Sequence, residues 1–119
     1  MLKSSATLTV SDVAAESGIA ASAVRFYERQ GLISAARTGG NQRRFDRDAV
    51  CRVKVARVAQ RVGLSVAEIR EMLATLPSDP RLDDWLRLRV QLADEAHRRI
   101  SALEAVLDDI ATDQKLCDL

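Results

Sequence analysis

Residues 9–33 read TVSDVAAESGIAASAVRFYERQGLI and decide the fold. Apolar residues recur there at the three- and four-residue spacing of a helical face, so we expect a first helix over residues 9–17. Gly18 ends that helix, and a second short helix is expected over residues 21–30, before Gly31. Two short helices joined by a three-residue glycine turn have the spacing of a helix-turn-helix, the motif whose second helix enters the major groove of DNA.

The next stretch has the pattern of a small β-hairpin. Residues 32–33 and 43–45 are expected to form two short strands, because the TGGN sequence of residues 38–41 between them is a strong turn signal. Such a hairpin forms a wing beside the helix pair.

Two further helices are expected to complete this part of the chain. The third covers residues 46–62, with an aspartate as its cap and glycine after its last residue. Ser65 and Glu68 have the spacing of a capping box, which satisfies free backbone donors at a helix start and opens a fourth helix over residues 65–76. Two prolines then mark residues 77–81 as a linker.

One long helix is expected over residues 82–111, followed by a tail of residues 112–119. Its apolar stripe must be shielded from water by another surface. Folding back onto the short helices is one option, but the linker is brief. We therefore favour contact with a second copy of the chain across a two-fold axis. We therefore predict a mainly α protein, with a winged helix-turn-helix DNA-binding domain over residues 1–76 and a dimerisation helix that forms an antiparallel coiled coil. The predicted interface residues are Trp85, Leu88, Leu92, Ala96, Ile100, Leu103, Val106, Leu107 and Ile110.

Length and composition exclude several classes of protein. With 119 residues, 47% of them hydrophobic and only 3% aromatic, the chain can build one main core, mostly from small aliphatic side chains on helices. No apolar run approaches the ~20 residues that span a bilayer, and the first residues lack the apolar stretch of a signal peptide, so we expect a cytoplasmic protein. Two cysteines are too few for a disulfide framework.

The net charge of +1 hides an asymmetry between the two parts of the chain. Residues 1–76 contain 12 Lys and Arg against seven Asp and Glu, whereas residues 77–119 contain six basic and ten acidic side chains. A basic first part favours a polyanionic partner, and nucleic acid is the leading one.

The residues do not form a catalytic set. His97 is the only histidine, and no Ser or Cys is spaced near it as a nucleophile would be. The carboxylates of Asp83 and Asp84 are adjacent on a helix and so point in different directions. We therefore expect no enzymatic activity.

The residue types suit DNA instead. Arginines on the second helix can reach guanine edges or phosphates, a serine can donate to either, and long donors beside the glycine turn of the wing can reach the flanking backbone. Tyr27 can give its hydroxyl to a phosphate. The candidate DNA-binding residues are Ser11, Ser22, Ala23, Arg25, Tyr27, Arg29, Arg37, Asn41, Gln42, Arg43 and Arg44.

These stretches carry a family resemblance. The VSDVA that begins at residue 10, AVRFYERQGLI at 23–33 and GNQRRF at 40–45 resemble the N-terminal domain of MerR-type transcription regulators, and the likeness continues through the long helix. GNQRRF and Trp85 are most similar to the SoxR branch, which binds a [2Fe-2S] cluster and senses redox-active compounds. The resemblance implies a homodimer that binds promoter DNA, distorts it by untwisting and bending, and works with RNA polymerase.

The departure from that branch lies in the cysteines. SoxR proteins place four cysteines after the long helix as C-x2-C-x-C-x5-C, whereas this stretch has Cys117 alone, so we expect no [2Fe-2S] cofactor and no metal on this chain. Cys51 is expected to be a small buried residue of the third helix. The input signal has three possible interpretations. Cys117 could act as a thiol switch, a small apolar ligand could bind in a cleft beside Trp85, or sensing could be lost. The candidate sensor residues are therefore Cys117 and Trp85.

Two rival interpretations stay open at this point. One is a protein-interaction module whose long helix pairs with a different protein. The other is a cluster-bearing redox sensor whose missing ligands lie beyond Leu119.

Overall fold

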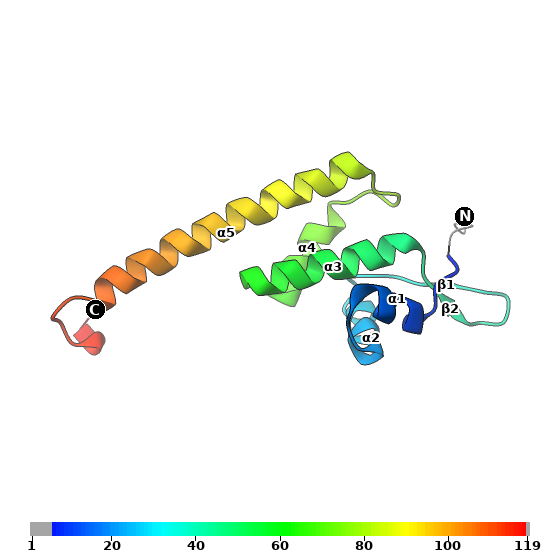
Figure 1. Cartoon of the computed structure of the whole chain (residues 1–119), viewed down its shortest axis with the longest axis horizontal. Helices are drawn as coiled ribbons and strands as arrows, with labels where there is room; N and C mark the ends of the chain where they lie inside the picture. Colours follow the sequence, from blue (N-terminus) through cyan, green and yellow to red (C-terminus); the bar gives the residue numbers. More distant parts are fainter. Residues whose placement is uncertain (1–5, 119) are drawn as a thin grey trace.

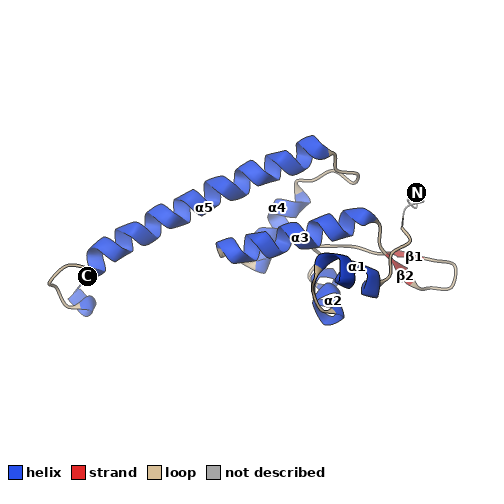
Figure 2. Ribbon diagram, viewed as in Figure 1, coloured by secondary structure: helices blue, strands red, loops and turns tan. Residues whose placement is uncertain are grey.

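The protein is elongated, with overall dimensions of 67 × 30 × 20 Å. A computed structural model describes residues 6–118 (Figure 1), in which helices dominate and one short hairpin is the sheet (Figure 2). The first five residues, Lys3 of the basic part among them, and Leu119 of the predicted tail lie outside the described residues.

The helix-turn-helix is confirmed. Helix α1 spans Val10–Ser17 and begins with a capping box, in which Thr9 and Asp12 each accept a hydrogen bond from the other's backbone N–H. Gly18 ends the helix in the left-handed conformation at φ 71°, which glycine adopts without a steric penalty. Helix α2 spans Ala21–Arg29 and packs against α1.

The wing is present, but its first strand is not where the sequence places it. Strand β1 is Ala36–Arg37 and pairs antiparallel with β2, Arg43–Arg44. Leu32 and Ile33 do not form a strand: both side chains are buried in the core after the left-handed turn at Gly31. A strand would direct only one of the two inward, so this expectation is wrong.

Helices α3 and α4 form the centre of the molecule. Helix α3 spans Arg47–Val62 and α4 spans Val66–Ala74, which ends two residues before the predicted end. The predicted capping box at the start of α4 is confirmed, because the Ser65 hydroxyl and the Glu68 carboxylate each accept from the other's backbone N–H at 3.1 and 2.8 Å.

One hydrophobic core joins all of these elements. Helix α3 packs against α1, α4 and the long helix, and its buried alanines allow the neighbouring backbones to approach closely. The fully buried larger side chains are Phe45, Leu32, Ile69, Leu73, Leu88, Val13, Val24 and Val53.

The long helix α5 spans Leu82–Ile110 and runs alongside α3 before it projects beyond it (Figure 1). Leu88 and Leu92 are buried within the chain, so the expectation that the whole stripe is free for a partner is wrong for these two residues. The chain does fold back, because the turn after α4 returns the start of α5 onto α3. A short 3₁₀-helix, Leu116–Asp118, lies in the tail.

No helix in the described part of the chain is both long and apolar enough to cross a membrane.

Candidate nucleic-acid interface

Helix α2 separates its side chains into a core face and an exposed face. Val24 and Tyr27 are buried against the other helices, whereas Ser22, Arg25 and Arg29 are exposed. These three side chains share a face because they are three and four residues apart. A helix that buries one side against its own domain and offers serine and arginine on the other can lie in a major groove.

The two arginines of this face are electrostatically available. Within residues 6–118, neither Arg25 nor Arg29 has a hydrogen-bond or ion-pair partner. By contrast, Arg47 is bound to Glu16 at 2.8 Å, and Arg52 is bound to Asp48 at 2.6 Å. A cation without a carboxylate partner carries its full charge to an incoming phosphate or guanine edge.

The tip of the wing is closed by its own backbone. The Thr38 N–H donates to the Gln42 carbonyl at 2.9 Å, and the Asn41 N–H donates to the Thr38 carbonyl at 2.9 Å. Asn41 has φ 58°, a left-handed conformation that asparagine tolerates better than most side chains. Arg37 donates to the Asn41 carbonyl at 3.2 Å, so one guanidinium is already folded over the turn.

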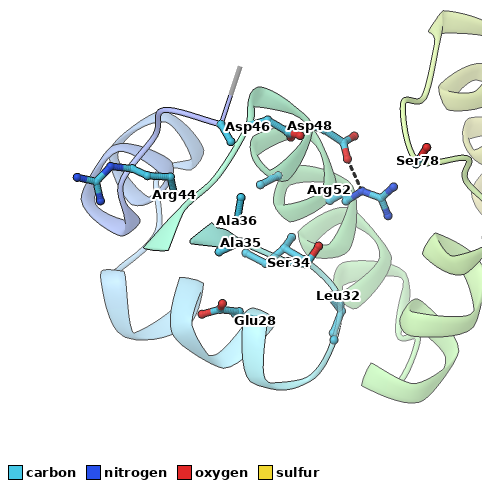
Figure 3. Close-up of a pocket in the computed structure, with 14 residues that line it drawn as sticks. Glu28, Leu32, Ser34, Ala35, Ala36, Arg44, Asp46, Asp48, Arg52 and Ser78 are labelled. Atoms are coloured by element: carbon cyan, nitrogen blue, oxygen red, sulfur yellow. Dashed lines mark hydrogen bonds and ion pairs between the residues drawn. The ribbon is translucent and has the colours of Figure 1, made fainter. Parts of the chain in front are cut away.

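An ion pair joins the wing to α2. Arg43 of the wing lies 3.3 Å from the carboxylate of Glu28, the one acidic residue of α2. Arg44 donates to the Gln42 side-chain oxygen at 2.8 Å and extends from the wing (Figure 3). Glu28 could not be identified as a partner from the sequence, because the pair depends on how the hairpin folds over the helix.

A hollow of about 650 Å³ lies between the wing, the end of α2 and the start of α3 (Figure 3). Its wall includes the Asp48–Arg52 pair, and Arg52 also donates to the backbone carbonyls of Leu73 and Pro77, each at 3.4 Å. These contacts tie α3 to α4 and to the segment that follows. We therefore interpret this wall as a structural junction.

Tyr27 does not lie where a phosphate donor would. Its side chain is only 5% exposed, and its hydroxyl donates to the Gln60 side-chain oxygen at 2.7 Å. Burial raises the pKa of Tyr27 above its ordinary value, and the nearby Arg57 partly offsets this. The expectation of an exposed phosphate donor at Tyr27 is thus corrected: the hydroxyl ties α2 to α3.

The other predicted DNA-binding residues are at or near the surface. Ala23 and Arg44 are half-buried. Phe26, which the sequence analysis did not select, lies half-buried four residues from Ser22, on the same face as the arginines. The exposed residues are Ser11, Ser22, Arg25, Arg29, Arg37, Asn41, Gln42 and Arg43.

Comparison with known proteins adds an independent observation. Residues 8–76 match the family model described as MerR HTH family regulatory protein, and residues 50–112 match the one described as MerR, DNA binding. The chain belongs to the MerR family. It is a DNA-binding transcriptional regulator of that family, and all the residues of the interface above lie within the first matched range.

Relatives by sequence include transcription regulators. An HTH-type transcriptional activator SoxR homolog of Chromobacterium violaceum is 42% identical over 106 residues, which cover 87% of this chain and 72% of that protein. The HTH-type transcriptional regulator CueR of Salmonella typhi is 29% identical over 113 residues, which cover 92% of this chain and 81% of that protein.

Solved structures share the fold of this MerR-family chain. A MerR family transcriptional regulator from Listeria monocytogenes has a TM-score of 0.62 at 26% identity, over 87% of this chain and 80% of that one. HiNmlR, described as a MerR family regulator lacking the sensor domain and bound to promoter DNA, has a TM-score of 0.59 at 24% identity, over 87% of this chain and 84% of that one.

The cysteines of this MerR-family chain lie differently from the prediction in one case. Cys117 is exposed, as expected. Cys51 is also exposed, so its assignment as a buried residue is wrong: it lies in the first half of α3, between the buried Val50 and Val53, but its own side chain faces solvent. Among residues 6–118, no three His, Cys, Asp or Glu side chains gather as they would around a metal ion.

Proposed function

We propose that this MerR-family regulator binds promoter DNA as a homodimer, with α2 in the major groove and the wing on the flanking backbone. One observation carries the proposal: Ser22, Arg25 and Arg29 share an exposed face of α2, and neither arginine has a partner within residues 6–118. Serine and arginine are donors to base edges and phosphates, so this face can both position the protein and read sequence.

The homodimer rests on the exposed half of α5. Beyond α3, the helix carries apolar side chains that are half or more exposed, and leaving this surface in water costs about 25 cal/mol for each Å². A second copy across a two-fold axis covers the surface on both chains at once. The exposed residues are Ile100, Leu103, Val106, Leu107 and Ile110.

The proposed mode of action rests on the family resemblance. MerR-family resemblance supports a regulator that untwists and bends its promoter for RNA polymerase. A DNA partner supports a location in the cytoplasm. It also supports a regulatory role and not an enzymatic one. Residues 111–119 alone do not supply the ligands of a [2Fe-2S] cluster, because Cys117 is their single cysteine. The signal to which the regulator responds stays open between Cys117, a ligand beside Trp85 and no sensing.

The test is DNA affinity measured by fluorescence anisotropy at two salt concentrations. Arg25→Ala with Arg29→Ala should weaken binding. The slope of log affinity against log salt concentration should fall by about one for each phosphate that the variant no longer neutralises. Arg87→Ala with Arg98→Ala removes the same charge from exposed α5 positions and should change little. Equal affinity of all three proteins would reject α2 as the DNA-binding element and favour a protein-interaction module.

Dimerisation is tested separately by sedimentation. Leu103→Asp with Leu107→Asp should yield monomers that keep the N-terminal fold, because both side chains are exposed in the single chain and outside its core. An unchanged dimer would show that another surface forms the interface. Leu92 is unsuitable for this test, since it is buried in the core of its own chain.

A further inference from the structure

The C-terminal end of α2 is held by an arginine from another helix. Arg70 of α4 donates from Nε to the backbone carbonyl of Gln30 at 2.6 Å, and from Nη2 to the side-chain oxygen of Gln30 at 3.2 Å. Gln30 is the C-terminal cap of α2 and directly follows Arg29. Two donors of one planar guanidinium therefore converge on a single residue, at the end of the helix that carries the exposed arginines.

We propose that Arg70 is a positioning residue for the reading of DNA by α2. It contacts Gln30 and not DNA, and it fixes the direction in which the last turn of α2 presents Arg29. The inference rests on the proposed function above, in which the exposed face of α2 enters the major groove. It adds a residue that lies outside this face and acts on sequence preference.

Helix α2 depends on such support from its neighbours. It contains nine residues, and its N-cap is Ala20, whose side chain cannot cap a helix, whereas α1 and α4 both begin with a capping box. A helix of this length is marginal in isolation, so its direction is set by the elements around it. It packs on α1, and the Tyr27 hydroxyl binds Gln60 of α3. Arg70 adds a contact at its C-terminal end.

The chemistry of a helix end suits a guanidinium. The last carbonyl groups of a helix have no partner within it and carry the negative end of its dipole. At the end of α2, the N–H of Gly31 donates to the carbonyl of Glu28 at 3.0 Å, whereas the carbonyl of Gln30 accepts from Arg70. The arginine lies across this turn, since a Cβ built on Gly31 would be 3.7 Å from its Nε. Within residues 6–118, Arg70 pairs with no carboxylate.

The helix that carries Arg70 is itself fixed in the fold. The adjacent Ile69 is fully buried, and Leu73 is buried three residues after Arg70. The capping box of Ser65 and Glu68 fixes the start of α4. A side chain can position another element only if its own element is held in place. Helix α4 meets this requirement.

The same kind of contact recurs at two other helix ends. Arg57 of α3 donates to the Ser17 carbonyl at the end of α1 at 3.0 Å, and Arg99 of α5 donates to the Gly63 carbonyl after α3 at 2.8 Å. In each case the arginine belongs to the second helix that follows. The contact at Gln30 is therefore one use of a device that the fold repeats, and it is the one on the helix that presents the DNA-reading face.

Two substitutions separate positioning from a direct phosphate contact of Arg70. Arg70→Lys keeps the positive charge but loses the planar pair of donors, so a phosphate contact would survive this change, whereas the hold on Gln30 would be weakened. Arg70→Ala removes both the charge and the hold.

The DNA probe is a pool of random-sequence duplexes, from which the wild type selects its preferred sites. Sequence preference is the affinity for a selected duplex divided by the affinity for a random one, both measured by fluorescence anisotropy. Arg70→Ala should lower this ratio about five- to tenfold, and Arg70→Lys should lower it at least about threefold. On random DNA, the slope of log affinity against log salt concentration should stay that of the wild type, because the number of neutralised phosphates does not change.

The ratio also distinguishes positioning from a role in folding alone. Unfolded molecules bind neither duplex specifically, so a loss of stability would lower both affinities by the same factor and leave the ratio unchanged. Gln30→Ala removes the side-chain acceptor but keeps the carbonyl, and it should lower the ratio less than Arg70→Ala does. Arg98→Ala is the matched control, because it removes the same charge from an exposed position of α5 and should change neither the ratio nor the slope.

Three results would overturn the inference. The first is a slope reduced by about one in Arg70→Ala with wild-type binding in Arg70→Lys, which would show that Arg70 contacts phosphate. The second is an equal loss of both affinities, which would show a role in folding alone. The third is an unchanged ratio in both Arg70 variants while Arg25→Ala with Arg29→Ala still weakens binding, which would retain the proposed function. A wild type that selects no sequence would reject the inference and the proposed function together.

Discussion

The guanidinium of Arg99 donates a 2.8 Å hydrogen bond to the carbonyl of Gly63, 36 residues earlier in the chain. The same side chain also donates to Glu95 on its own helix at 3.0 Å and lies 3.4 Å from Glu68 of α4. Gly63 has φ 106°, and a Cβ built there would lie 3.0 Å from the Arg99 guanidinium. Arg99 thus joins α5 to the turn between α3 and α4, at the place where the long helix leaves the rest of the chain.

Removal of the Arg99 contacts should lower the free energy of unfolding. Arg99→Ala is expected to cost about 1–2 kcal/mol in urea unfolding, because a hydrogen bond from a charged donor to a backbone carbonyl is removed. The matched control is Arg98→Ala, since Arg98 is exposed and, within residues 6–118, pairs only with Glu95. Its removal should cost less than about 0.5 kcal/mol. Equal costs for the two variants would show that the contact with Gly63 contributes nothing.

Features encoded in neighbouring residues could be predicted from the sequence. The capping box of Ser65 and Glu68 and the helix ends at Gly18 and Gly63 follow from backbone chemistry within four residues, and each is confirmed. The exposed face of α2 follows from helical periodicity, because the buried Val24 requires the opposite side to face solvent.

Features that depend on contacts between distant segments could not be predicted. Leu88 and Leu103 belong to the same apolar stripe, yet only Leu88 is covered by α3, and the turn before α5 decides which. The hydroxyl of Tyr27 finds Gln60, which is 33 residues away. Ile33 has a β-branched side chain of the kind enriched in strands, but it is buried in the core outside either strand, so tertiary burial overrides that preference.

The capping box of α4 should make stability depend on pH. Hydrogen bonds from the backbone and the hydroxyl of Ser65 lower the pKa of Glu68, and Arg99 adds to the effect. A carboxyl whose pKa is lowered by folding stabilises the fold above its unfolded pKa of about 4.3 and loses that contribution as pH falls through the lowered value. Glu68→Gln should therefore be less stable than wild type at pH 7, with the difference shrinking towards pH 3.

Urea unfolding at both pH values measures this difference. Glu71→Gln is the control for loss of an exposed carboxylate on the same helix. A difference between wild type and Glu68→Gln that is the same at pH 7 and pH 3 would contradict the assignment of the capping carboxylate.

The ion pair between Glu28 and Arg43 should restrain DNA binding. Glu28→Gln removes a carboxylate from the interface and releases Arg43, so affinity for random duplex DNA should rise by about three- to tenfold at low salt. The slope of log affinity against log salt concentration should become steeper by about the amount that one additional phosphate contact contributes. Asp94→Asn, at an exposed position on α5, makes the same charge change away from the wing and should leave affinity unaltered. Unaltered affinity in Glu28→Gln as well would mean that Arg43 does not reach the backbone.

Substitutions should distinguish a side chain that reads DNA bases from one that contacts the DNA backbone. Arg44→Ala in the wing is expected to weaken binding to operator and random DNA alike, because a phosphate contact carries no sequence information. Arg25→Ala on the exposed face of α2 should instead reduce preference at one base pair of each half-site, at a cost of about 1–3 kcal/mol. Binding to a panel of single-base operator variants measures the two patterns. If Arg25→Ala lowers affinity for every sequence by the same factor, Arg25 contacts phosphate, and α2 reads the operator through other residues of the same face.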